Sequence, residues 1–107
     1  MMKIVYCEEW SLFYKQPHKV LSEQEAKEKA AKEENYAVVL YEDNKVCYVI
    51  EVHKESLIVR FYNDALEDYL LYGFVKREDR LFLNMAYHYT YLDGEMQEMT
   101  LFSFKEN

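Results

Sequence analysis

The 107-residue chain is poor in the residues that interrupt secondary structure, with two glycines and one proline. We therefore expect regular elements joined by short connections. Cysteine is scarce too, and Cys7 and Cys47 are too few for a disulfide framework, so both are expected to be reduced, buried thiols. No apolar run approaches the ~18 residues of a membrane span, and acid follows soon after the N-terminus, which argues against a signal peptide. These shortages predict one soluble, cytoplasmic domain over residues 1–107.

Acidic residues and tyrosine are in excess. Twenty Asp and Glu against thirteen Lys and Arg give a formal net charge of −7, and eleven tyrosines accompany six phenylalanines. Half of the residues are hydrophobic, which excludes disorder on composition. A domain this acidic repels a phosphate backbone, so no nucleic-acid binding is expected.

One segment has the signature of a helix. Ser22-Glu23-Gln24-Glu25 is a capping box, in which the Ser22 hydroxyl accepts from the Glu25 N–H and the Glu25 side chain reaches back. Three glutamates after Ser22 each precede a lysine by four residues, the orientation that stabilises a helix. The apolar stripe consists of alanines alone: Ala26, Ala30 and Ala31. Such a stripe contributes little area, so the main core must come from elsewhere.

The rest of the chain alternates apolar and polar residues with a period of two, which is typical of β-strands. The expected strands are Lys3–Cys7, Trp10–Lys15, Tyr36–Glu42, Val46–His53, Leu57–Tyr62, Tyr69–Lys76, Leu81–Leu92 and Met96–Phe104. Pro17 is expected to end the second of them. Ala65–Phe74 also fits a helical period, and strand is the preferred of the two interpretations.

The turns between these strands predict a register. A type I′ turn at Asp93-Gly94 sets Tyr91 opposite Met96 and Tyr89 opposite Glu98. A turn at Glu78-Asp79 sets Leu70 opposite Tyr87, Tyr72 opposite Met85 and Phe74 opposite Leu83. A turn at Lys54-Glu55 aligns Val52 with Leu57, and Cys47 is expected opposite Leu40. The sequence thus predicts an α+β fold, with one N-terminal helix packed on a curved, mainly antiparallel meander sheet that is similar in outline to cystatin-like or NTF2-like folds.

Catalytic chemistry finds little support in the residue pattern. His18, His53 and His88 lack the spacing of metal ligands, and burial is expected to make the Cys47 thiol unreactive. His88 fits a polar sheet face better than a general base, and two glycines cannot build a phosphate-binding loop. We therefore expect no catalytic residue, no metal site and no cofactor.

A charge pattern does emerge when the chain is threaded through a meander. Alternate turns lie at one end of the sheet, and that end gathers seven acidic residues against Lys45: Glu42, Asp43, Asp64, Glu67, Asp68, Asp93 and Glu95. Several tyrosines fall close to these turns: Tyr41, Tyr62, Tyr69, Tyr89 and Tyr91. One interpretation is that polar turns serve solubility. The other is a protein-binding end, because acid speeds encounter with a basic partner and tyrosine offers rigid contact area.

The second interpretation predicts a basic protein partner such as a nuclease or a toxin. Its predicted partner-binding residues are Glu42, Asp43, Asp64, Glu67, Asp68, Tyr69, Tyr89, Tyr91, Asp93 and Glu95. A polyanionic surface of this kind could plug a cleft that is positively charged to hold phosphates.

A resemblance points to the same class. Five stretches carry the resemblance: Tyr69-Leu70-Leu71-Tyr72-Gly73-Phe74, Arg80-Leu81-Phe82-Leu83, Tyr87-His88-Tyr89-Thr90-Tyr91, Asp93-Gly94-Glu95-Met96 and Phe102-Ser103-Phe104. They resemble the closing hairpins of small bacterial toxin-immunity proteins. These acidic, tyrosine-rich cytosolic domains neutralise a cognate toxin by direct binding. The resemblance covers roughly the last third of the chain, and it implies a non-enzymatic inhibitor without assigning any binding residue.

Two alternatives stay open. One is a small-ligand-binding or enzymatic domain with a pocket on a concave sheet, for which Tyr48, Tyr72, Tyr87 and His88 are the candidates. The other is a homodimeric structural module that pairs through an uncovered sheet face: Leu71, Ala86 and Leu101.

Overall fold

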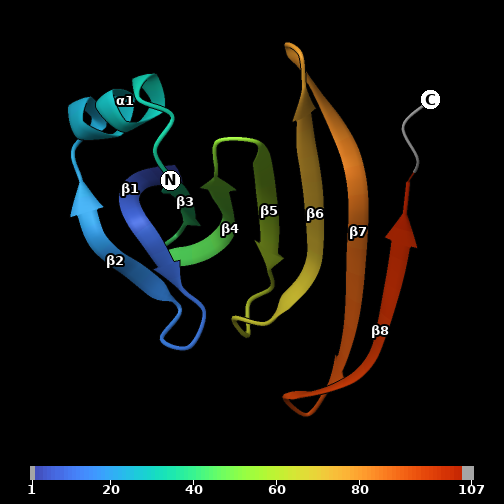
Figure 1. The fold of residues 1–107 in the computed structure, drawn as a ribbon. Helices are drawn as coiled ribbons and strands as arrows, with labels where there is room; N and C mark the ends of the chain where they lie inside the picture. The colour runs from blue at the N-terminus through green and yellow to red at the C-terminus, as the bar shows by residue number, and fades with distance from the viewer. Residues whose placement is uncertain (1, 105–107) are drawn as a thin grey trace.

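The protein is an eight-stranded antiparallel sheet with one helix, seen in a computed structural model that describes residues 2–104 (Figure 1). The elements in chain order are β1 (Met2–Ser11), β2 (Gln16–Leu21), α1 (Glu23–Ala31), β3 (Tyr36–Glu42), β4 (Lys45–Val52), β5 (Ser56–Tyr62), β6 (Asp68–Arg77), β7 (Arg80–Leu92) and β8 (Glu95–Ser103). The order across the sheet is β2-β1-β3-β4-β5-β6-β7-β8. β3 to β8 therefore form a plain meander, whereas β2 and α1 carry the chain from one side of β1 to the other.

The prediction of an α+β fold with an N-terminal helix is wrong. The helix follows two strands, spans nine residues and contacts mainly β1, β2 and β3, so the fold is a β-sheet with one small helix. The strand predicted at Trp10–Lys15 is also wrong: Trp10 and Ser11 end β1, residues 12–15 form a turn, and Pro17 does not end a strand but sits inside β2, opposite Trp10. Proline is tolerated there because β2 is an edge strand, with one side that needs no ladder hydrogen bond.

The capping box is confirmed at the start of α1. The Ser22 hydroxyl accepts from the Glu25 N–H at 3.0 Å, and the Glu25 carboxylate accepts from the Ser22 N–H at 2.9 Å. Of the expected ion pairs, Lys27 lies 3.4 Å from Glu23, while Lys29 reaches Glu8 in β1 at 3.9 Å. The helix is thus held by its cap and by charge, and it buries one small side chain, Ala26.

The predicted strands of the meander are confirmed to within a few residues, and 68–77 is a strand as preferred. The register holds next to each turn: Val52 faces Leu57, Phe74 faces Leu83 and Tyr91 faces Met96. The β4–β5 register holds along its whole length, whereas the β3–β4, β6–β7 and β7–β8 registers slip by one residue farther along, at β-bulges. Four predicted pairs are therefore wrong. In the structure Tyr89 pairs with Met99, Leu70 with His88, Tyr72 with Ala86, and Leu40 with Tyr48 rather than Cys47.

A one-residue slip moves every later side chain to the other face of the sheet. Tyr87 therefore lies beside Leu71 rather than Leu70, and it points to the opposite face from Tyr72.

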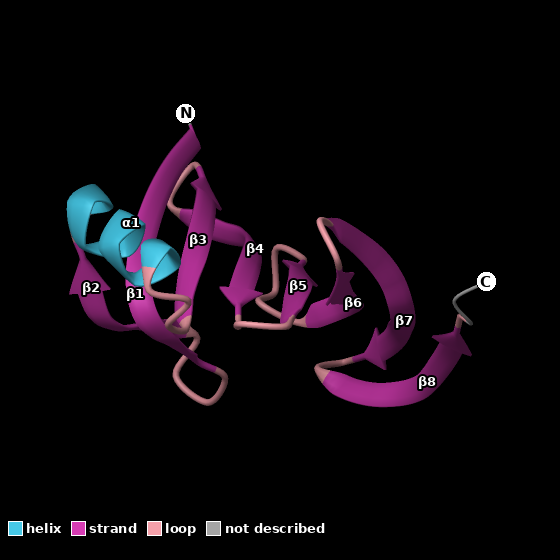
Figure 2. Ribbon diagram, turned by 45° about the horizontal axis from the view of Figure 1, so that its top comes forward, coloured by secondary structure: helices cyan, strands magenta, loops and turns pink. Residues whose placement is uncertain are grey.

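The core lies on one face of the sheet, which we call the core face. Its buried residues are Cys7, Trp10, Ala37, Val39, Val46, Val49 and Tyr62. β1 belongs to the first half of the sheet and β5 to the middle, yet the Trp10 indole N–H donates to the Tyr62 hydroxyl at 2.9 Å. The first half must therefore curl so that the end of β1 lies over β5, and Figure 1 shows the β1–β2 turn next to the β5–β6 loop. α1 packs on the opposite face, beside Tyr6 and Tyr36, and we call this the helix face (Figure 2).

The shortage of glycine leaves its mark on the turns. Within residues 2–104, eight residues other than glycine have a positive φ, including Asp43 and Asn44 at +50° and +67° in the β3–β4 turn. Two successive positive φ values are the requirement of a type I′ hairpin, and Asp and Asn meet it at the lowest cost after glycine. Short hairpin connections are thus made with very little glycine.

The molecule exposes more surface than its size requires. Its accessible area is 7690 Å², against about 6,300 Å² expected for a folded monomer of 13.0 kDa. Its radius of gyration is 14.7 Å, against about 13 Å for a compact domain of this length. Among the described residues, none of the helices has the length and apolar character needed to cross a membrane.

Candidate functional site

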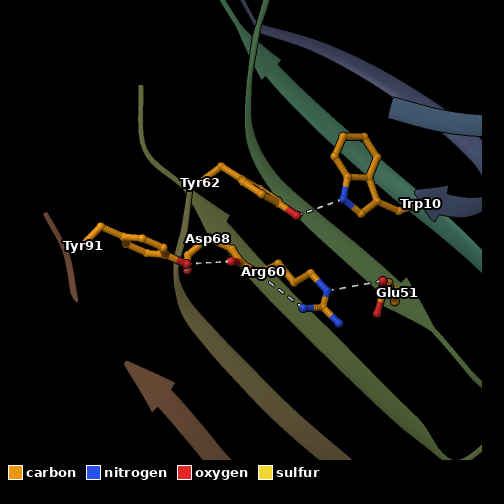
Figure 3. Close-up of polar contacts among 6 residues, drawn as sticks. All are labelled: Trp10, Glu51, Arg60, Tyr62, Asp68 and Tyr91. Atoms are coloured by element: carbon orange, nitrogen blue, oxygen red, sulfur yellow. Dashed lines mark hydrogen bonds and ion pairs between the residues drawn. The ribbon is translucent and has the colours of Figure 1, made fainter. Parts of the chain in front are cut away.

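A polar cluster lies on the core face beside the buried residues, and Figure 3 shows its members. Arg60 of β5 lies between two carboxylates: its Nε is 3.4 Å from Glu51 Oε1 and its Nη1 is 3.4 Å from Asp68 Oδ2. The Tyr91 hydroxyl donates to Asp68, with 2.8 Å to the backbone oxygen and 3.1 Å to Oδ1. We call Glu51, Arg60, Asp68 and Tyr91 the Arg60 cluster.

Strand register explains how the Arg60 cluster assembles. Arg60 pairs with Val49 on one side and Leu71 on the other, so its side chain rises on the core face between two apolar neighbours. Its side chain is only 15% exposed, and those of Glu51 and Asp68 are 18% and 22% exposed. Two carboxylates around one guanidinium leave the cluster with a net negative charge in a partly desolvated place, where charge interactions are stronger than in water.

The cluster changes the acidity of its tyrosine. Burial raises the pKa of Tyr91 well above its usual value, and the hydrogen bond to Asp68 and the negative charges of Asp68 and Glu67 raise it further. Burial also raises the pKa of Tyr62, although the Trp10 N–H partly opposes this. Both phenols therefore stay protonated and can act as donors, since ionisation would place another negative charge beside Asp68.

The predicted acidic residues of the β5–β6 loop have different surroundings. Asp64 is exposed. Glu67 is half-buried, and its carboxylate accepts from the Asn63 side-chain amide at 3.0 Å. Asp68 belongs to the Arg60 cluster and is held inside the fold. Asp64 is therefore the acidic residue of this loop that is presented most openly to a partner.

The other predicted acidic residues lie on two further connections. Glu42 and Asp43 are exposed at the β3–β4 turn, and Asp93 and Glu95 are exposed at the β7–β8 turn. The strand order places all three connections at the same ends of their strands. The β3–β4 turn is four strand spacings from the β7–β8 turn, on the order of 20 Å, and the twist of the sheet separates them further (Figure 2). The acidic residues of the β3–β4 turn thus lie well apart from those of the β7–β8 turn.

The predicted tyrosines also divide. Tyr69 is 37% exposed, and its ring lies 6.4 Å from that of Phe61. Tyr89 is half-buried and stacks on Tyr87 with 6.1 Å between ring centroids, and Tyr91 is bound to Asp68. Tyr69 is therefore the tyrosine of the predicted set that is most open to a partner.

Sequence reasoning missed Arg60, Glu51 and Trp10. A signal for Arg60 was present, since it is the one charge in the otherwise apolar run Leu57–Tyr62. No local signal pairs Trp10 with Tyr62, because the contact depends on the curl of the sheet. The same curl brings Lys15 of the β1–β2 turn to 5.1 Å from the Tyr62 ring centroid, so a base lies close to the β5–β6 loop.

A cleft of about 360 Å³ is lined by residues of β1, β3 and β4, by the adjoining Asn35 and His53, and by one residue of α1, Lys29. Its polar lining includes Glu8, Lys29, Glu51 and His53, with Trp10 and Tyr36 beside them. The four residues predicted for a ligand pocket lie elsewhere and do not converge. Tyr48 and Tyr72 are in an aromatic row with Phe61 on the helix face, at 5.6 and 5.4 Å between centroids, whereas Tyr87 is on the core face.

The predicted dimer face is partly covered. Leu71 and Ala86 are 6% and 7% exposed, while Leu101 is 48% exposed. Leu71 and Leu101 both flank Tyr87 on the core face, and Ala86 lies on the helix face. Among residues 2–104, no group of three or more His, Cys, Asp or Glu side chains is arranged to hold a metal ion.

No protein-family model matches the chain, and searches of curated proteins and of solved structures found no match. The features of the molecule that bear on its function are the exposed acidic connections, the exposed Tyr69 and the Arg60 cluster that anchors the β5–β6 loop.

Proposed function

We propose that the chain is a non-enzymatic inhibitor of the immunity type, which binds a basic toxin or nuclease and neutralises it by direct contact. The observation that carries this proposal is the pair of acidic connections β5–β6 and β7–β8, which lie at the same end of the sheet (Figure 1). Their exposed acidic residues are Asp64, Asp93 and Glu95. Exposed acid on neighbouring loops raises the rate of encounter with a positively charged cleft.

The surroundings of these connections support a contact surface. Tyr69 directly follows the β5–β6 loop and offers an exposed, amphipathic ring. Asp68 ties the base of that loop to Arg60 and Tyr91, so the loop is anchored before a partner arrives. A pre-ordered loop loses less conformational freedom on binding. The proposal places the chain in the cytosol, where the free thiols of Cys7 and Cys47 stay reduced.

The test uses the products of the genes that flank this one, each expressed alone and together with the chain. We expect one product to arrest growth alone and to be harmless in the presence of the chain, with which it forms an isolable complex. If no flanking product is neutralised, the immunity role is wrong. If the chain is instead a small-ligand-binding domain that uses the cleft beside α1, no flanking product should be neutralised.

Charge reversal then locates the surface. The variant Asp64→Lys/Asp93→Lys/Glu95→Lys should slow association with the neutralised protein at least about tenfold at low salt, because it removes the attractive field at this end. The matched control is Glu55→Lys/Glu78→Lys/Asp79→Lys, which changes the net charge equally at exposed positions of the opposite strand ends. Association rates that fall equally in the two variants would show that total charge, rather than this end of the sheet, controls the encounter.

A further inference from the structure

The two edges of the sheet are built differently. β2 has six residues, contains Pro17, has Lys19 at a left-handed φ of +57°, and is contacted by α1. β8 has nine residues, none of them proline, glycine or lysine, and every one is exposed. Short length, proline and irregular backbone are the usual means by which an edge strand avoids pairing with another chain. β2 has these protections and most of β8 lacks them.

β8 also carries a large exposed apolar load. Met96, Met99, Leu101 and Phe102 are 55%, 54%, 48% and 52% exposed. Met99 and Leu101 lie beside Tyr89 and Tyr87 on the core face, whereas Phe102 lies beside Ala86 on the helix face. Apolar residues on both faces are typical of a strand inside a sheet rather than at its edge.

We propose that β8 pairs antiparallel with β8 of a second copy of the chain, so that one sheet runs continuously through a two-fold symmetric dimer. This inference goes beyond the proposed function and does not depend on it. A two-fold dimer brings the same surface of both copies together, so the strand must be complementary to itself.

Strand geometry limits the possible registers. A two-fold axis perpendicular to the sheet places one residue directly opposite its own copy, with its neighbours paired around it. The regular part of β8 is 98–103, because the register shift toward Met96 leaves Gln97 as an extra, bulged residue. An axis at Glu98 would set two carboxylates face to face, which is unfavourable.

An axis at Thr100 satisfies the regular segment. It pairs Met99 with Leu101 twice on the core face, sets the two Thr100 residues opposite each other, and places Glu98 opposite Phe102. Apolar pairs and Thr–Thr pairs are both favourable across strands. We therefore assign the two-fold axis to Thr100.

A second copy fits this edge better than the basic partner of the acidic loops. The large exposed side chains on 98–103, Met99, Leu101 and Phe102, are apolar and Glu98 is the one charge, so a basic surface would gain little there. On each copy this segment presents three half-exposed apolar side chains and a six-residue backbone edge for the second copy to cover. The accessible area of one copy, 7690 Å², exceeds that of a compact chain by about 1,400 Å², which is more than the roughly 500 Å² per copy that an interface of about 1,000 Å² in total removes.

The first experiment measures mass by analytical ultracentrifugation from micromolar to near-millimolar concentration. We expect the wild-type mass to rise toward twice the 13.0 kDa of one chain. Thr100→Lys places two ammonium groups opposite each other and should raise the dissociation constant at least about tenfold. The control Val20→Lys adds the same charge on the β2 edge, at a residue 67% exposed, and should dimerise as the wild type does. A monomeric wild type, or a Thr100→Lys dimer of unchanged affinity, overturns the proposal.

The second experiment tests the register and remains informative if Thr100→Lys fails to fold. In a Cys47→Ser background, Thr100→Cys should form a disulfide-linked dimer under mild oxidation, because residues directly opposite have Cα atoms about 4.5–5.5 Å apart. Glu98→Cys on the same strand and face should not, because its copies would lie about 13 Å apart. Efficient cross-linking by Glu98→Cys and none by Thr100→Cys would refute the assigned axis.

Discussion

At the scale of single residues, the contact between Tyr91 and Asp68 links the stability of the fold to the pKa of a tyrosine. A phenol donates a strong hydrogen bond to a carboxylate as long as the phenol keeps its proton. Asp68 also accepts from Arg60, so the bond belongs to a connected group that reaches from β4 to β7. The consequence is a stability that depends on the protonation state of one tyrosine.

The variant Tyr91→Phe should lower the free energy of unfolding by about 1.5–3 kcal/mol at neutral pH, the range for hydrogen bonds to charged groups. The folded-state pKa of Tyr91 is raised above the ordinary value of 10.0. Its contribution is therefore complete below about pH 10 and is lost as pH rises through the folded-state pKa, because the unfolded chain releases the proton first.

Urea denaturation across this range checks the prediction. The difference in free energy of unfolding between wild type and Tyr91→Phe should shrink above pH 10. Tyr14→Phe is the control, because Tyr14 is 69% exposed in the β1–β2 turn. A difference that stays constant with pH would show that the Tyr91 hydroxyl contributes no proton-linked stability.

At the scale of elements, β6 and β7 approach closely at Gly73. A Cβ built there would lie 2.8 Å from Met85 Cε and 2.9 Å from Met85 Cγ, which is closer than real contacts allow. Gly73 also lies next to the bulge that shifts the β6–β7 register. Position 73 therefore needs a glycine because the Met85 side chain leaves no room for a Cβ atom.

Gly73→Ala should lower the free energy of unfolding by about 1–3 kcal/mol, the usual cost of overpacking. In a Met85→Ala background the same change should be neutral or slightly stabilising, because alanine is favoured over glycine in a strand by about 0.5–1 kcal/mol. A double-mutant cycle by chemical denaturation measures the coupling. Additive effects would mean that backbone conformation, rather than contact with Met85, requires the glycine.

At the scale of the whole molecule, burial is uneven across the sheet. The fully buried side chains are Cys7, Val39 and Val49, in β1, β3 and β4, whereas β8 is exposed throughout. Local stability follows buried contact, so different parts of one sheet should open at different rates.

Amide hydrogen exchange of a dilute sample should therefore be slowest in β3 and β4 and fastest in β8. Mass spectrometry of peptic fragments gives the comparison within one experiment, with the β3–β4 fragments as the internal reference. At high concentration the proposed dimer should slow exchange in β8 and leave β3 unchanged. Equal protection of β4 and β8 at low concentration would contradict the uneven distribution of stability.

Much of the meander could be predicted because its signals are local. Period-two alternation and short polar turns locate β3 to β8, and the capping box at Ser22 locates α1. The bulges at Cys47, Asn84 and Gln97 could not be predicted, since an inserted residue leaves no mark in the alternation of a single strand. Each of them displaced the register beyond it.

The candidate site shows the same limit. The exposure of Asp64, Asp93 and Glu95 follows from their places in turns. The capture of Asp68 by Arg60 and Tyr91 does not, because it joins residues up to 31 positions apart through three strands. Pro17 misled for a related reason: its effect depends on whether the strand lies at an edge, which only the complete sheet decides.

The contact between Trp10 and Tyr62 has an optical consequence. Trp10 is the one tryptophan of the chain, it is 6% exposed, and its indole reaches the residue that precedes the β5–β6 loop. Its fluorescence should respond when a partner displaces that loop. β8 lies at the opposite edge of the sheet from the β1–β2 hairpin, so pairing of two copies there leaves the indole environment untouched. One emission spectrum can thus separate occupation of the acidic loops from self-association.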